Sequence, residues 1–142
     1  MKPKNKKSLD RKFMGEFNCG IFKNEFILGV NCEYDDFLKY AKETYCSEEF
    51  INYIKEIKED YKKYTDTSNG FVNFDYKKGY GILNLKKFED SWEFYEIMLH
   101  EICHIVDFIS EQKHLEKEME ARAYLTEYLF KDIRKKIQKF YL

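Results

Sequence analysis

The chain contains few of the residues that mark loops, and its charges are almost balanced. Its 142 residues include 1 proline and 6 glycines, while 36% are charged and 44% are hydrophobic. This balance excludes a disordered or collagen-like chain and is typical of a helix-rich globular protein. The formal net charge of -1 gives no reason to expect nucleic acid or an anionic membrane as a partner.

Long apolar runs and paired cysteines are also missing. No stretch reaches the length of a membrane-spanning helix or of a signal-peptide core, so we expect a soluble, cytoplasmic protein without a membrane partner. No two of the 4 cysteines are spaced as C-x-x-C, which favours free, mostly buried thiols over a zinc ribbon or a redox pair. No internal repeat is present, and the length fits one domain.

The N-terminal half shows a basic start followed by weak strand and helix patterns. We expect residues 1–12 to form a basic flexible tail and residues 13–142 to form a single domain. Weak alternation within 13–30 indicates two short strands. Apolar side chains at three- and four-residue steps predict one helix over 34–45 and another from Ser47 to the turn that starts at Thr65.

The C-terminal half shows clearer patterns. Two strand-like runs, 71–76 and 80–85, flank a joint that contains glycine and predict a β-hairpin. Hydrophobic spacing predicts a largely buried helix over about 91–110 and a final helix over about 115–140. We therefore expect an α+β fold, in which a small antiparallel sheet that includes hairpin 71–85 packs on helices.

The predicted helix 91–110 contains the pattern H-E-x-x-H, from His100 to His104. Histidines four residues apart lie on one face of a helix and can bind one metal ion together. Glu101 lies where it can contact a metal-bound water without being a ligand. The pattern also arises by chance, so its context decides. On a buried helix, two histidines and a glutamate would each need a polar partner, and a zinc ion would supply one to all three.

A hydrolytic zinc site takes three protein ligands plus water, so a third ligand is needed. Glu120, in the final helix, is followed by small residues that would allow the two helices to approach closely, and Glu116 is the alternative one turn earlier. On an antiparallel helix that starts near residue 113, Glu120 would lie level with the midpoint of the two histidines. Glu116 would fall a full turn short, so Glu120 is the predicted ligand.

The segment H-E-I-C-H, followed on the next helix by E-A-R-A-Y, resembles the gluzincin metallopeptidases. It is most similar to the small members carried by phages and mobile elements, the ImmA/IrrE-like and minimal gluzincin type. The resemblance implies a zincin-like domain in which zinc is bound by His100, His104 and Glu120, with Glu101 as general base. It covers only the C-terminal half of the chain. The E-x-x-x-D signature of thermolysin-like members is only approximated by Glu116 and Glu120.

We therefore expect a zinc-dependent metallopeptidase. Related enzymes pair an extended substrate with an edge strand before the metal helix, so a peptide or protein substrate is expected along strand 80–85. A tyrosine or histidine often stabilises the oxyanion in such enzymes, and Tyr124 is the candidate here. The alternative is a mobile-element binding module with a zincin fold whose metal is structural or absent. Small size favours this alternative, whereas the intact Glu101 disfavours it.

Overall fold

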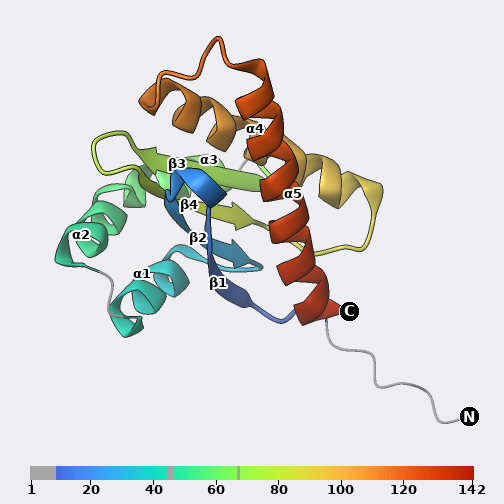
Figure 1. Cartoon of the computed structure of the whole chain (residues 1–142). Coiled ribbons are helices and arrows are strands. Elements are labelled where there is room, and N and C mark those ends of the chain that lie inside the picture. Colours follow the sequence, from blue (N-terminus) through green and yellow to red (C-terminus); the bar gives the residue numbers. More distant parts are fainter. Residues whose placement is uncertain (1–8, 45–46, 67) are drawn as a thin grey trace, which may run out of the picture.

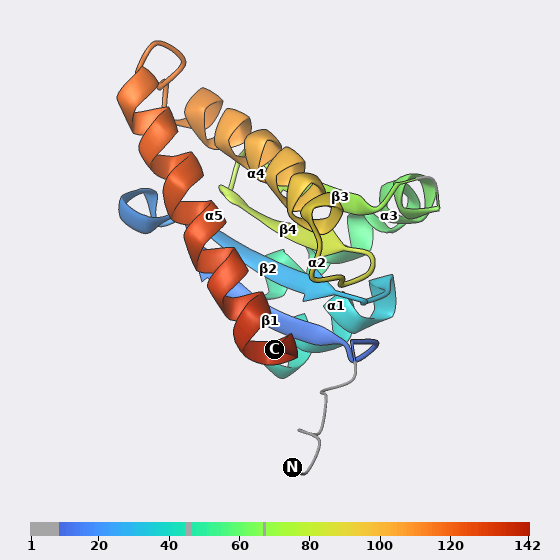
Figure 2. The ribbon, with the colours of Figure 1, turned by 90° about the vertical axis from the view of Figure 1, so that its right-hand side faces the viewer.

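The computed structural model describes residues 9–44, 47–66 and 68–142 as a four-stranded sheet with helices on both faces (Figure 1). α1 to α3 cover one face of the sheet, and the long helices α4 and α5 cover the other (Figure 2). The elements are, in chain order, β1 (Phe13–Asn18), the 3-10 helix η1 (Gly20–Phe22), β2 (Glu25–Val30), α1 (Tyr34–Glu43), α2 (Glu48–Glu56), α3 (Lys58–Thr65), β3 (Gly70–Asp75), β4 (Tyr80–Leu85), α4 (Trp92–Gln112) and α5 (Met119–Tyr141). The predicted single α+β domain is confirmed.

The strand order is β1-β2-β4-β3, and the sheet is mixed. β1 pairs antiparallel with β2, and β3 pairs antiparallel with β4, the second of which is the predicted hairpin. The central pair, β2 and β4, is parallel, so the expectation of an antiparallel sheet is corrected at this pair. A parallel pair needs a long connection, which here consists of α1 to α3 and β3. Local sequence patterns do not reveal such pairing.

The two central strands of the sheet are the most buried ones. In β2 and β4 every residue except the first is buried, whereas β1 and β3 are mostly half-buried or exposed. In β4, Ile82 faces the core under α1 to α3, while Leu83 and Leu85 face the core under α4 and α5. An interior strand that is covered on both faces reads as a nearly continuous apolar run, and 80–85 has this pattern apart from Asn84.

Serine side chains begin two of the helices. Ser47 Oγ accepts the backbone N–H of Phe50 at 3.2 Å at the start of α2, as predicted. Ser91 Oγ accepts the N–H of Phe94 at 3.3 Å at the start of α4. The second predicted helix is interrupted, because Ile57 separates α2 from α3.

α5 begins later than predicted because of the way α4 ends. His114 adopts a left-handed backbone conformation with φ 58°. The N–H of Leu115 donates to Ser110 O at 2.7 Å, and the N–H of His114 donates to Glu111 O at 3.4 Å. This is a Schellman motif with His114 in the place usually taken by glycine, so no helix can begin at residue 113 or 114. α5 starts at Met119 instead.

A buried asparagine joins three segments behind the hairpin turn. Asn24 Nδ2 donates to Gly79 O at 2.6 Å and to Gln112 Oε1 at 2.8 Å. Gly79 has φ 77°, and a Cβ added there would lie 2.7 Å from Gln112 Nε2. Only glycine allows this approach. The start of β2, the turn between β3 and β4, and the end of α4 are therefore held together.

Residues 1–8 of the predicted basic tail lie outside the described residues. Its last two residues contact the domain: Arg11 donates to Phe140 O at 2.7 Å, and Lys12 pairs with Asp36 at 2.9 Å. The predicted tail is therefore attached to α5 and α1 at residues 11 and 12. None of the helices in the described part of the chain is both long and apolar enough to span a bilayer.

Candidate metal centre

His100 and His104 lie one helical turn apart on the solvent-facing side of α4, and both are exposed. Their Nε2 atoms are 3.1 Å apart, and their ring planes are inclined by 81°. Two imidazoles on a tetrahedral zinc, each about 2.0–2.1 Å from the metal, place their nitrogen atoms roughly 3.3 Å apart. The pair therefore fits two ligand positions of a zinc site. A hydrogen bond between one protonated and one bare ring nitrogen accounts equally for the separation.

Glu101 lies on the side of α4 that faces β3 and is 8% exposed. A Cβ added to Gly70 would lie 2.8 Å from Glu101 Cγ and 2.9 Å from Glu101 Oε1, so glycine at this strand position leaves room for the carboxylate. Burial raises the pKa of Glu101, while the charges of His104 and His100 act in the opposite direction. A carboxylate with a raised pKa accepts a proton more readily than a carboxylate with the ordinary pKa.

A groove of about 540 Å³ runs between α4 and β3 and contains both histidines. Its lining residues are Tyr64, Ser68, Gly70, Phe71, Val72, Asn73, His100, Glu101, His104 and Phe108. Aromatic contacts stiffen the walls: Tyr64 stacks on Phe71 with ring centroids 6.4 Å apart, and Phe108 stacks on Phe74 at 5.3 Å. The groove therefore combines polar groups from α4 with apolar walls.

The strand beside this groove is β3, and it is an edge strand of the sheet. The prediction that 80–85 supplies the edge strand was wrong, because β4 pairs with β2 on one side and with β3 on the other. The N–H of Lys86 donates to Asn69 O at 2.8 Å, and bonded pairs alternate along an antiparallel ladder. Residues 70, 72 and 74 therefore turn their main-chain N–H and C=O groups away from β4, toward the open side.

Glu120 lies in the first turn of α5 and is exposed. The ion pair between Arg122 and Asp107, at 2.6 Å, marks where α4 and α5 are level. Ile102, midway between the histidines, lies roughly 7.5 Å from that level toward the start of α4. Glu120 lies on the other side of that level, toward the connection between the two helices. Within 9–44, 47–66 and 68–142, no three His, Cys, Asp or Glu side chains are grouped to hold a metal. Neither Glu120 nor Glu116 thus joins both histidines, and the third ligand stays a prediction.

The predicted oxyanion residue lies elsewhere on α5. Tyr124 stacks with Tyr128 at 6.1 Å, and its hydroxyl lies 3.2 Å from the position of a Cβ on Gly20. It is not among the groove residues, so its role also stays a prediction. The tyrosine that does line the groove is Tyr64, which is 51% exposed. The apolar spacing of α3 predicts Tyr64 on the inner helix face together with Tyr61, but of these two only Tyr61 is buried.

Comparisons with protein-family models, with curated proteins and with solved structures give no match for this chain. The resemblance to gluzincins therefore rests on the residues of the motif and of α5. The case for function rests on the histidine pair, the buried Glu101 and the edge strand beside them.

Proposed function

We propose that the protein is a zinc-dependent metallopeptidase. The observation that carries this proposal is the histidine pair, whose Nε2 atoms lie 3.1 Å apart. Both histidines line a groove that is bordered by an edge strand. His100 and His104 would hold the metal. When bound, zinc would acidify a water molecule and polarise a peptide carbonyl.

Glu101 would be the general base. Its side chain lies between the histidines and Gly70 of β3, so a peptide bound along β3 would pass beside its carboxylate. There Glu101 would accept the proton of the attacking water and then deliver it to the leaving amine nitrogen. Burial, which raises the pKa of Glu101, suits both transfers.

The substrate would be a peptide in extended conformation that adds a strand to the sheet. The outward main-chain groups of Val72 and Phe74 would pair with it, as β-strand addition does in other complexes. The carbonyl of Gly70 already accepts the hydroxyl of Ser68 at 2.8 Å, so pairing at Gly70 would use its N–H. Main-chain pairing gives affinity with little dependence on sequence. The aromatic walls at Tyr64 and Phe108 would favour apolar side chains on the substrate.

Glu120 is the proposed third ligand, by the resemblance to gluzincins, with Glu116 as the alternative. α5 begins at Met119 without a side-chain cap, so its first turn is the less firmly held end of the helix. The connection over 113–118 and this first turn are the parts whose movement would bring Glu120 toward the histidines.

A non-catalytic binding module is the second candidate. The separation of Glu120 from the histidine pair favours it, because two ligands alone do not hold zinc firmly. The intact Glu101 in the groove disfavours it, since a structural metal site has no need of a general base.

Metal analysis and peptide hydrolysis on three proteins test the proposal. We expect about one zinc per chain in the native protein and a large loss in His100→Ala. Glu101→Gln should retain zinc but lose hydrolysis, because the amide fills the same volume without accepting a proton. Native protein that is free of metal and gains no thermal stability from zinc would contradict the metal site. Zinc without hydrolysis in the native protein would favour the binding module.

A further inference from the structure

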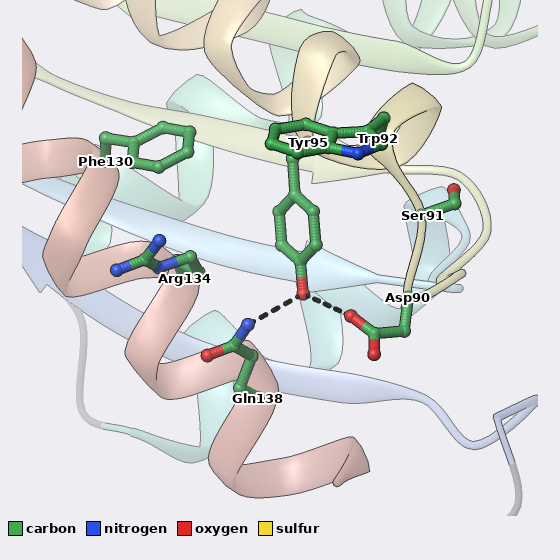
Figure 3. Close-up of a pocket in the computed structure, with 7 residues that line it drawn as sticks. All are labelled: Asp90, Ser91, Trp92, Tyr95, Phe130, Arg134 and Gln138. Atoms are coloured by element: carbon green, nitrogen blue, oxygen red, sulfur yellow. Dashed lines mark hydrogen bonds between the residues drawn. The ribbon is translucent and has the colours of Figure 1, made fainter.

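A second hollow, of about 350 Å³, lies between the start of α4 and the C-terminal half of α5 (Figure 3). Its lining residues are Asp90, Ser91, Trp92, Tyr95, Phe130, Arg134 and Gln138, and none of them lines the histidine groove. Sites for small ligands span roughly 300 to 1,000 Å³. The hollow is thus large enough for a small ligand and is independent of the proposed metal centre.

Tyr95 forms a fixed surface within this hollow. Its hydroxyl donates to Asp90 Oδ1 at 3.1 Å and accepts the amide N–H of Gln138 at 3.0 Å, so residues on both sides hold the ring (Figure 3). A ligand that packs on this ring would not have to order it first. Pre-ordered contact surfaces lower the entropy cost of binding.

Two further aromatic rings border the hollow, one from each helix. Phe130 of α5 reaches toward Tyr95 and Trp92 of α4 (Figure 3). Trp92 is the only tryptophan of the chain, and its side chain is 82% exposed. An indole of this exposure leaves a large apolar surface in water, and a flat ring placed against it would remove that surface from solvent. The hollow therefore offers stacking surfaces to a planar group.

Arg134 supplies the positive charge of the site. Its guanidinium lies 5.3 Å from the centroid of the Phe130 ring. Among the described residues it has no carboxylate within ion-pair distance, in contrast to Arg122, which pairs with Asp107. Asp90 is engaged by the hydroxyl of Tyr95. A guanidinium beside an aromatic face can donate two parallel hydrogen bonds to a carboxylate or a phosphate.

We propose that this hollow binds a flat aromatic ring that carries a carboxylate or phosphate group. The ring would pack against Trp92 and Phe130, and the anionic group would meet Arg134. Stacking and charge come from different side chains, so a ligand that contains both parts should bind better than either part alone. The site does not depend on zinc or on peptide hydrolysis.

Fluorescence of Trp92 tests the proposal directly, because no other tryptophan contributes. The probes are adenosine 5′-monophosphate and N-acetylphenylalanine, which present a ring with a phosphate and a ring with a carboxylate. Adenosine, phosphate, N-acetylphenylalaninamide and acetate supply the separate parts. We expect at least one complete probe to change the emission saturably at millimolar concentration or below. Its separate parts should bind at least about tenfold more weakly.

Substitutions on α5 provide the controls. Arg134→Gln should weaken binding of the responding probe by about tenfold. Lys135→Gln removes the same charge from the adjacent exposed position outside the hollow and should bind like the native protein. His100→Ala should also bind like the native protein, which separates this result from the test of the metal site. No saturable change with either probe, or equal affinity in Arg134→Gln and native protein, would overturn the proposal.

Discussion

The two faces of α4 carry different side chains under different constraints. The face toward the sheet contains a row of fully buried apolar residues, namely Met98, Ile102, Ile105 and Ile109. The opposite face carries exposed side chains that can bind a proton or a metal, namely His100, Cys103, His104 and Asp107. Buried packing fixes where the helix lies, so residues on the outer face are left free for chemistry. Glu101 lies at the boundary, buried yet bordering the groove.

The first way to break this comparison is to remove one apolar side chain from the inner face. Ile102→Ala should lower the free energy of unfolding by about 2–5 kcal/mol, because the residue is 0% exposed and the site would become a cavity. Urea denaturation of metal-free protein measures the change. His104→Ala, on the outer face, should change it by less than about 0.5 kcal/mol. Equal losses in the two variants would mean that the faces do not differ as described.

The second test concerns what completes the outer face as a metal site. Glu120→Ala should weaken zinc binding by roughly 3 kcal/mol, more than a hundredfold, because one of three protein ligands is lost. Glu116→Ala should change the affinity little. Competition with a chelator measures both variants, and the reverse order would exchange the roles assigned to the two glutamates.

The third test acts at the boundary between the faces. In Gly70→Ala the new methyl group would meet Glu101 Cγ and Oε1, so the carboxylate must move. Displacing a catalytic group by about 1 Å costs on the order of a hundredfold in turnover. Zinc content should stay unchanged, because the histidines point to the outer side. Gly15→Ala in β1 is the matched control, since the three atoms nearest to its methyl all belong to the ring of Phe13 and none to a groove residue. Unchanged turnover in Gly70→Ala would argue against Glu101 as the base.

The smallest expected effect comes from an ion pair on the outer face. Asp107 and Arg122 are 62% and 32% exposed, and exposed pairs contribute about 0.2–1 kcal/mol. Arg122→Gln should therefore lower the free energy of unfolding by no more than about 1 kcal/mol. Lys131→Gln, which removes an exposed pair within α5, serves as its control. A loss of several kcal/mol in Arg122→Gln alone would show that this contact anchors α5 to α4.

Local features of the fold could be predicted from the sequence. The hairpin of β3 and β4, the position of α4 and the cap at Ser47 depend on residues that are close in sequence. The histidine pair is equally local, because a spacing of four residues on a helix brings two side chains together. The sequence predicts mostly buried thiols; Cys19 and Cys32 are buried, whereas Cys103 is exposed on the outer face of α4.

Long-range features could not be predicted in the same way. The pairing of β2 with β4 joins strands that are separated by three helices, although the apolar run 80–85 did contain the signal of an interior strand. The left-handed turn at His114 could not be predicted, because glycine or asparagine usually marks such a helix end and residue 114 is a histidine. The predicted start of α5 is therefore too early, and the predicted level of Glu120 along α4 is wrong for the same reason.

The contacts of Asn24 link the two walls of the histidine groove at one end. This side chain joins β2, the hairpin turn and Gln112 at the end of α4, so opening any of these segments would break a hydrogen bond of a buried residue. The two walls of the histidine groove, β3 and α4, lead to these contacts, so moving the walls apart at this end would cost the hydrogen bonds of Asn24. The connection over 113–118 lies beyond Gln112. The width of the groove at this end is therefore linked to one buried side chain, and the connection from α4 to α5 lies outside that link.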